Sequence, residues 1–216
     1  MLGIQHGGLI KLRVLIVEAH PDDGVGSCGG TICKMLELGF EVKMIYFCPC
    51  DEDPLNSGHL EDHARALNIL GLSEMWGYKI PRDIAENHKQ EIRDALWKIK
   101  EEYQPQLVIC PNPHDFHQDH RAVGDCCLTI FRDVATILGF EVWRSSNYDF
   151  HANLFVKLEE RHVDTKLRAL SQYRTQLERR SKSFKLGVFQ AGMVARGAQI
   201  LEPYAEAFEF LWGKII

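Results

Sequence analysis

The fold is decided by one stretch near the N-terminus, residues 14–31, which read VLIVEAHPDDGVGSCGGT. The first four residues are valine, leucine or isoleucine, and such a short apolar run predicts a strand that is buried on both faces. The run stops at a turn that carries His20, Asp22 and Asp23, and a glycine-rich bend follows. The stretch therefore predicts a strand, a turn and a helix, with one imidazole and two carboxylates at the end of the strand.

The composition is that of a globular protein with a sizeable core. The chain has 216 residues, of which 45% are hydrophobic and 25% charged, and the formal net charge is −5. This length suits one α/β domain, so we expect a single domain over residues 1–216. The excess of acidic residues argues against a nucleic-acid partner, because a surface that binds the phosphate backbone needs a surplus of basic residues.

The sequence carries no recognisable signal for export or membrane insertion. The N-terminal residues have no apolar run behind a charged start, so we expect no signal peptide. The longest apolar run is far shorter than the ~20 residues that a membrane helix needs. The seven cysteines include no CxxC pair, which indicates buried free thiols in a reducing compartment. We therefore expect a cytoplasmic protein without a membrane span.

Apolar runs that suit strands alternate with amphipathic runs that suit helices. Strands are expected at residues 12–17, 42–48, 75–80, 107–110, 141–146 and 153–158. Helices are expected at residues 29–38, 60–70, 84–103, 119–138 and 163–176, with a short final helix at 205–212. This order predicts a single-domain, Rossmann-like, three-layer α/β/α fold with a mainly parallel sheet.

Two clusters of reactive side chains follow two of the expected strands. His20, Asp22 and Asp23 follow the first strand, and HDFHQDH, at residues 114–120, follows the strand at 107–110. Ligands bind beyond the carboxyl ends of the strands in parallel α/β sheets, so both clusters are expected at one sheet edge. Either cluster alone would more simply be a capped turn or a surface loop. Their joint occurrence at two strand ends favours a functional site.

Three ligands from His and Asp, with an open position for water, are typical of catalytic zinc. The best set is His20, Asp23 and His120, which Fe²⁺ or Co²⁺ could also occupy. Asp22 would then be free to act as a general base. Asp119 could orient an imidazole, and His117, as an imidazolium, could hydrogen-bond an oxyanion. Together these parts indicate metal-assisted hydrolysis of an amide or ester.

The motifs AHPDDxxxxxGGTI and HxDHRAVGD resemble those of the PIG-L/LmbE-like zinc-dependent N-deacetylase family. The similarity continues in KLRA at residues 166–169, YRTQ at 173–176, and YAEAF at 204–208. The resemblance implies Zn²⁺ on His20, Asp23 and His120, and the same roles for Asp22, Asp119 and His117 as above.

The resemblance also implies the reaction. Such proteins remove an N-acetyl group from an amino-sugar substrate, such as an N-acetylglucosamine conjugate, and release acetate and a free amine. Two alternatives stay open, namely a catalytically degenerate member that still binds metal or sugar, and a hydrolase of a different acyl amide. The substrate is expected to be a small molecule, and a homo-oligomer is compatible with the sequence.

Some positions depart from the family pattern or need an explanation of their own. The first motif of the family usually continues AHPDDE, whereas this chain has Gly24 and so lacks that carboxylate. Glu18 ends a buried strand and is expected either to line the cleft or to pair with Arg13 or Lys11.

Candidate substrate contacts come from the second half of the chain. Arg196 could contact a polar or anionic substrate group or form a structural salt bridge. Tyr148 lies in a loop that could wall a sugar site, because aromatic faces stack on sugar rings. His59, His63 and His88 are expected to be solvated helix residues rather than ligands.

Overall fold

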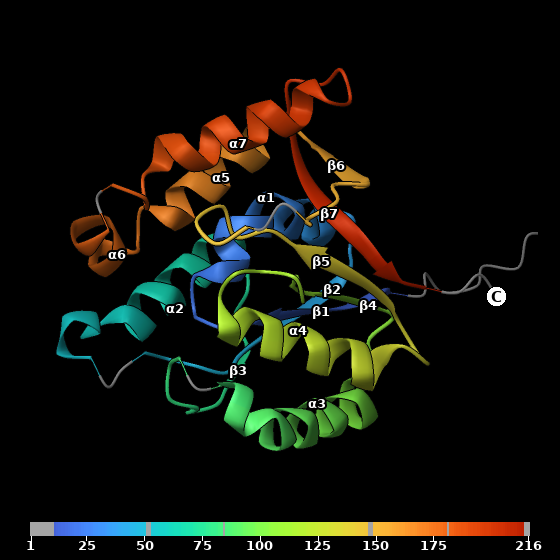
Figure 1. Ribbon diagram of the computed structural model, residues 1–216. Coiled ribbons are helices and arrows are strands. Elements are labelled where there is room, and N and C mark those ends of the chain that lie inside the picture. The colour runs from blue at the N-terminus through green and yellow to red at the C-terminus, as the bar shows by residue number, and fades with distance from the viewer. Residues whose placement is uncertain (1–10, 51–52, 84, 147–148, 181, 214–216) are drawn as a thin grey trace, which may run out of the picture.

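A mixed seven-stranded sheet forms the centre of the computed structural model, within the described residues 11–50, 53–83, 85–146, 149–180 and 182–213 (Figure 1). The strand order is β3-β2-β1-β4-β5-β7-β6. The strands are β1 (Arg13–Glu18), β2 (Glu41–Tyr46), β3 (Met75–Gly77), β4 (Leu107–Pro111), β5 (Thr136–Phe140), β6 (Leu154–Leu158) and β7 (Tyr204–Trp212). Strands β1 to β5 pair in parallel, whereas β7 pairs antiparallel with β5 and β6. The expected α/β fold with a mainly parallel sheet is confirmed.

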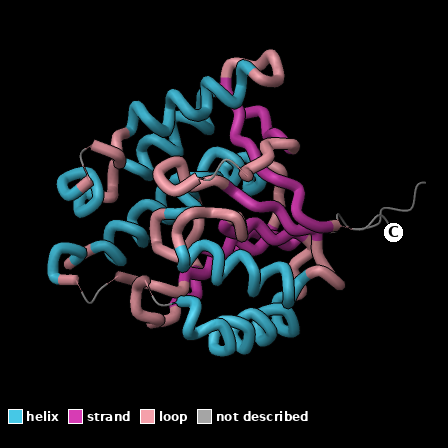
Figure 2. Tube along the Cα trace, viewed as in Figure 1, coloured by secondary structure: helices cyan, strands magenta, loops and turns pink. Residues whose placement is uncertain are grey.

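Helices cover both faces of this sheet, and they are drawn in cyan in Figure 2. They are α1 (Asp23–Glu37), α2 (His59–Leu70), α3 (Lys89–Tyr103), α4 (Gln118–Phe131), α5 (Glu160–Leu170), α6 (Arg174–Arg179) and α7 (Leu186–Ala198). Short 3₁₀ turns lie at Pro54–Asn56 and Ala85–His88. Helices α3 and α4 pack together on one face, and α1, α2 and α5 pack on the other. None of the helices in the described ranges has the length and apolar character needed to cross a bilayer.

Strand β1 lies at the centre because both of its faces are apolar. Leu15 and Val17 pack into the core beneath α3 and α4, while Val14 and Ile16 pack into the core beneath α1, α2 and α5. All four side chains are fully buried. A strand with two buried faces needs an unbroken apolar run, which is why the sequence predicts it so directly.

The strand order reverses next to β1. The chain continues from β1 outward to β2 and β3, and then returns to place β4 on the other side of β1. In open α/β sheets, such a reversal leaves a crevice beyond the carboxyl ends of the two central strands, where ligands bind. The turn after β1 and the loop after β4 both lie at this crevice, as expected from the sequence.

Two expected elements after β4 are wrong. The helix expected at residues 119–138 ends at Phe131, and β5 begins at Thr136. Both segments are apolar and neither glycine nor proline separates them, so the pattern merged them into one helix. Residues 141–146 form a turn instead of a strand, closed by the N–H groups of Ser145 and Ser146, which both donate to the Val142 carbonyl.

The C-terminal expectations also need correction. Residues 205–212, expected as a helix, belong to β7, which lies between β5 and β6 and pairs with both. This pairing outweighs the good helix propensity of its Ala, Glu and Leu residues. The helix expected at 163–176 is divided into α5 and α6, and α7 was not expected because its glycines disfavour a helix. All seven cysteines are buried and free, as expected.

Candidate metal centre and active site

The turn after β1 holds His20 and Asp23 in a fixed relation. The N–H groups of Asp22 and Asp23 donate to the His20 carbonyl at 2.8 and 3.1 Å. In return, the His20 N–H donates to Asp23 Oδ2 at 2.8 Å. Because α1 begins at Asp23, this carboxylate also lies at a helix N-terminus, where the helix dipole favours negative charge.

The loop after β4 reaches the same place because α4 packs tightly against it. A Cβ atom on Gly124 would lie 2.5 Å from the Pro111 carbonyl oxygen, so a larger residue cannot occupy this position without a backbone shift. His117 is the N-cap of α4, and its Nδ1 accepts the Asp119 N–H at 3.2 Å. The first turn of α4 thereby brings Asp119 and His120 to the turn after β1.

His20, Asp23 and His120 come together as the sequence predicts. His20 Nδ1 lies 3.2 Å from His120 Nε2 and 3.4 Å from Asp23 Oδ2, and His120 Nε2 lies 3.2 Å from that same oxygen. The donors of a tetrahedral zinc site bind at about 2.0–2.2 Å and so lie roughly 3.3–3.5 Å apart. All three residues are buried, and their donor atoms fit one divalent ion.

In each of the two imidazoles of this triad, the ring nitrogen that does not face the shared centre lies close to a carboxylate. His20 Nε2 lies 3.1 Å from Asp119 Oδ2, and His120 Nδ1 lies 3.2 Å from Asp115 Oδ1. Asp119 also accepts two backbone N–H groups from the loop after β3, at 2.8 and 3.0 Å. Such carboxylates fix the tautomer and the orientation of metal-binding histidines. Asp119 therefore lies where an orienting residue is expected, against His20 rather than against its neighbour His120.

Asp115 is a part of the site to which the sequence analysis assigned no role. Its side chain is buried, and it accepts the His117 N–H at 2.7 Å and the Ser145 hydroxyl at 3.1 Å. The Ser145 hydroxyl oxygen in turn lies 3.3 Å from His120 Nδ1. The only signal for Asp115 in the sequence was its place within the HDFHQDH cluster.

Asp22 lies next to the triad in the wall of a cavity. The residue is the N-cap of α1, but its side chain makes no capping hydrogen bond. Asp23 and His120 line the same cavity, and so do the apolar side chains of Phe184, Val188 and Phe189. The Asp22 carboxylate is therefore placed to meet a molecule in the cavity.

Charges at the site shift the pKa values of its histidines in opposite directions. Burial lowers the pKa of His120, but the charge of Asp23 and the hydrogen bond to Asp115 outweigh burial and raise it to about 10. Burial, together with the charges of His20 and His120, lowers the pKa of His117 to about 4. His117 is therefore neutral at pH 7, and its proton lies on Nε2 because Nδ1 accepts a hydrogen bond. The structure favours this neutral donor over the expected imidazolium.

Glu18 explains why position 24 is a glycine. Glu18 Oε1 accepts the Gly24 N–H at 2.6 Å, and a Cβ atom at position 24 would lie only 2.8 Å from this oxygen. Glu18 is fully buried, so it does not line the cleft, and its ionic partner is neither Arg13 nor Lys11. A carboxylate therefore lies beside position 24, but it comes from β1.

The partner of Glu18 is a buried histidine. Glu18 Oε2 lies 3.2 Å from His63 Nε2, and His63 Nδ1 lies 2.7 Å from the Tyr173 hydroxyl. His59, one turn earlier on α2, is also buried, and its Nδ1 lies 3.3 Å from the Thr175 hydroxyl. The expectation that His59 and His63 are solvated is therefore wrong.

Arg196 adopts one of its two expected roles. Its guanidinium donates to Glu141 Oε1 at 2.6 and 2.9 Å and lies over the ring of Trp143. It is not among the residues that line the cavity beside Asp22. The other candidate substrate contact, Tyr148, lies outside the described residues.

The chain has a Rossmann-like α/β sheet, and a His/Asp triad lies at the point where the strand order reverses. These two features place it among α/β proteins with a candidate metal site. Within this class, residues 15–131 match the family model described as PIG-L, GlcNAc-PI de-N-acetylase. The chain therefore belongs to the PIG-L family.

Similar proteins agree with this assignment. The chain is 30% identical over 126 residues to a diacetylchitobiose deacetylase of Thermococcus kodakarensis, a match that covers 52% of this chain and 46% of that protein. It is 25% identical over 169 residues to the uncharacterized deacetylase YaiS of Escherichia coli, covering 75% of this chain and 90% of that protein. The crystal structure of the conserved protein TT1542 from Thermus thermophilus has the same fold, with a TM-score of 0.76 at 21% identity, over 95% of this chain and 97% of that one.

Proposed function

We propose that the protein is a zinc-dependent deacetylase that removes an N-acetyl group from an amino-sugar substrate and releases acetate and a free amine. The observation that carries the proposal is the buried triad of His20, Asp23 and His120, whose donor atoms lie 3.2–3.4 Å apart. The family supports the reaction class, and the similar Thermococcus protein is named as a diacetylchitobiose deacetylase.

The donor set suits a zinc ion. Two imidazole nitrogens and one carboxylate oxygen would hold the ion, and Fe²⁺ or Co²⁺ could bind to the same atoms. A zinc ion held by these atoms would lower the pKa of a bound water from 15.7 toward about 7 and would polarise a carbonyl oxygen. Asp119 and Asp115 keep the two imidazole rings turned toward the shared centre.

Asp22 acts as the general base in this proposal. Its carboxylate lines the cavity next to the triad and is not used in capping α1. It accepts a proton from the attacking water, and once protonated it gives this proton to the leaving nitrogen. A single carboxylate that first accepts and then donates completes the proton balance of amide hydrolysis.

His117 stabilises the negative charge that forms on the carbonyl oxygen. Its ring centroid lies 4.8 Å from that of His20 and 4.7 Å from that of His120, which places it beside the triad. Because Nδ1 of the ring accepts the Asp119 N–H, the neutral imidazole carries its proton on Nε2 and donates from there. A donor that is already in position costs little reorganisation during the reaction.

The test is acetate release by zinc-loaded protein from N-acetylglucosamine and N,N′-diacetylchitobiose. We expect release by the wild type and a loss of about 100-fold or more in kcat for Asp22→Asn, because general-base catalysis contributes about 10²–10⁴. Zinc content should stay at one ion per chain, because Asp22 is not a member of the triad.

Two outcomes overturn the proposal. One is equal rates for the wild type and Asp22→Asn, and the other is zinc binding without acetate release from any N-acetylated amino sugar. The second outcome indicates a degenerate member that still binds metal. Release of a longer carboxylic acid from other N-acyl amides indicates instead a hydrolase with a different acyl specificity.

A further inference from the structure

We infer that the substrate carries an anionic group, a carboxylate or a phosphate, which binds to Arg82, Arg144 and Arg180 at the outer end of the active-site cavity. The inference rests on the proposed function for the acyl end of the substrate. It adds the chemistry of the opposite end of the substrate, argued from the arginines of this chain.

The first argument is that the cavity connects the triad to these arginines. Asp23 and His120 line the cavity beside Asp22, and Arg144 and Arg180 line it too. An adjoining hollow shares three of its residues and adds three more cations; it is lined by Arg82, Arg144, Arg179, Arg180, Lys182 and Ser183. We call the basic residues of this second hollow the cationic rim. One molecule can therefore contact the triad and the cationic rim at the same time.

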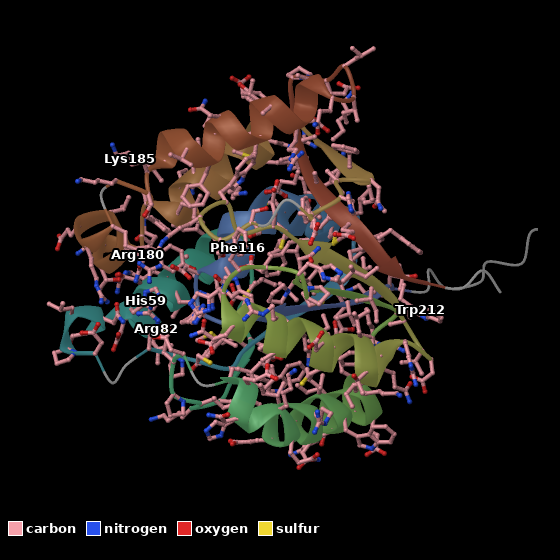
Figure 3. The ribbon with its side chains drawn as sticks, viewed as in Figure 1. His59, Arg82, Phe116, Arg180, Lys185 and Trp212 are labelled. Carbon is pink, nitrogen blue, oxygen red and sulfur yellow. The ribbon has the colours of Figure 1, made fainter. Side chains whose placement is uncertain are left out.

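The arginines come from separate parts of the chain. Arg82 lies in the loop after β3, Arg144 in the turn after β5, and Arg180 directly after α6. Figure 3 shows Arg82 and Arg180 on the same side of the molecule, although they come from different segments. A helix with a solvated charged face would place its cations on one element. Convergence from three segments onto one hollow is instead typical of a binding site.

The second argument is that Arg144 and Arg180 have no ion-pair partner among the described residues. Arg179 is already engaged, because it donates to Asp53 at 2.6 Å and to Asn56 at 2.5 Å. Arg82 pairs with its neighbour Asp83, at 3.5 Å between Nε and Oδ1. Within the described part of the chain, no carboxylate forms an ion pair with the guanidinium of Arg144 or Arg180.

The third argument is that these cations repel one another. The charge of Arg180, partial burial and the charge of Arg82 all lower the pKa of Arg144, although Asp22 acts in the opposite direction. The guanidinium groups are thus close enough to interact, in a chain whose formal net charge is −5. A bound anion would relieve this repulsion, and a cleft lined by one sign of charge attracts ligands of the other sign.

The chemistry of arginine selects the type of anion. A guanidinium is a planar fork that binds both oxygens of a carboxylate or a phosphate at once. The ligand must also offer an N-acyl group to the triad, so an amino sugar with an acidic substituent fits both ends of the cavity. A neutral chitin fragment leaves the arginines unused.

The experiment measures binding to the zinc-loaded Asp22→Asn protein, which separates binding from turnover. The probes are N-acetylglucosamine, N-acetylglucosamine 1-phosphate and N-acetylmuramic acid, which are neutral, phosphorylated and carboxylated, respectively. We expect at least one anionic probe to bind about tenfold or more tightly than the neutral sugar, with a preference that weakens as salt is added. The better of the two anionic probes identifies the anion.

Variants connect this preference to the rim. In the Arg144→Gln/Arg180→Gln background, the anionic and neutral probes should bind within about threefold of each other, because the bidentate contacts are lost. Arg174→Gln is the matched control, because Arg174 is an exposed residue of α6 that lines neither hollow. Thermal unfolding and zinc content show that the double variant is folded.

Equal affinity for all three probes in the parent protein, or an anion preference that persists in the double variant, overturns the inference. Acetate release by the otherwise wild-type enzyme is measured separately with the same probes. If neutral sugars are deacetylated without any anion preference, the proposed function stands and the inference fails. If the anions bind through the arginines and no probe is deacetylated, the anion site stands and the proposed function fails.

Discussion

The ammonium group of Lys166 lies 2.6 Å from Glu206 Oε1, in a pair whose side chains are each only 3% exposed. The same carboxylate accepts the N–H groups of Gly30 and Thr31, at 3.0 and 2.6 Å. These N–H groups need a partner because α1 is kinked at Cys28, where φ is −134°, and a second helical segment begins after the kink. Glu206 thus caps the second half of α1 from β7, and Lys166 neutralises the cap from α5.

Lys166→Met should lower the free energy of unfolding by about 3–5 kcal/mol, because it leaves the Glu206 carboxylate buried without its cation. Urea denaturation monitored by circular dichroism measures this loss. In the double variant with Glu206→Gln, much of the loss should be recovered, since neither charge is then buried alone. A loss below about 1 kcal/mol in the single variant would mean that water or another group replaces the lysine.

Gly24→Ala should cost about 1–3 kcal/mol of stability, because the new methyl group would lie 2.8 Å from Glu18 Oε1 in a packed region. The cost should shrink when Glu18 is first replaced by alanine, and a double-mutant cycle measures this coupling. Gly187→Ala is the control, because nothing lies within 4 Å of a Cβ atom there. It should be neutral or slightly stabilising, since alanine is favoured over glycine in a helix. An identical cost for Gly24→Ala in both backgrounds contradicts the steric explanation.

Zinc binding should release protons at pH 7. The pKa of His120 in the metal-free protein is raised to about 10, so a bound ion must displace its proton. The apparent zinc affinity should therefore fall as the pH falls. Calorimetric titrations in two buffers of different ionisation enthalpy measure the number of protons released, and identical heats in both buffers would contradict the prediction.

The same shift predicts how the stability of the metal-free protein depends on pH. A pKa raised above its ordinary value of 6.5 stabilises the folded state by a contribution that is complete below that pH. The contribution is lost as the pH rises toward about 10.

Asp115→Asn should weaken zinc binding by about 10–100-fold, as is usual when a carboxylate that orients a ligating histidine is removed. The loss is measured by competition with a chromogenic chelator. Asp125→Asn is a suitable control, because Asp125 lies on α4, the helix that carries His120, and pairs with Lys89 on the surface. An unchanged zinc affinity in Asp115→Asn would show that the contact between Asp115 and His120 does not hold the ring in place.

The centre of the fold could be predicted because its signals are local. The apolar run of β1 and the turn after it are contiguous in the sequence, and the rule for ligands at strand ends then places His120 near His20. Strand β7 could not be predicted in this way. Its composition suits a helix, and only its pairing with β5 and β6 makes it a strand.

The parts of the site that were missed depend on contacts between distant residues. Glu18 finds its partner His63 on α2, and nothing in the sequence around either residue indicates this contact. Arg82 and Arg144 stand singly in loops, Arg180 follows Arg179 at the end of α6, and the three form no motif. They share a hollow because the ends of β3, β5 and α6 converge in space.

His20 and His120 are separated by 100 positions in the chain, yet they lie across the seam between the adjacent strands β1 and β4. An ion held by both residues would act as a crosslink and close the intervening chain, from α1 to β4, into a ring. Closing a long loop removes conformational entropy mainly from the unfolded chain. While such an ion is held, opening of the sheet along this seam would have to break a metal–ligand bond as well as the hydrogen bonds between β1 and β4.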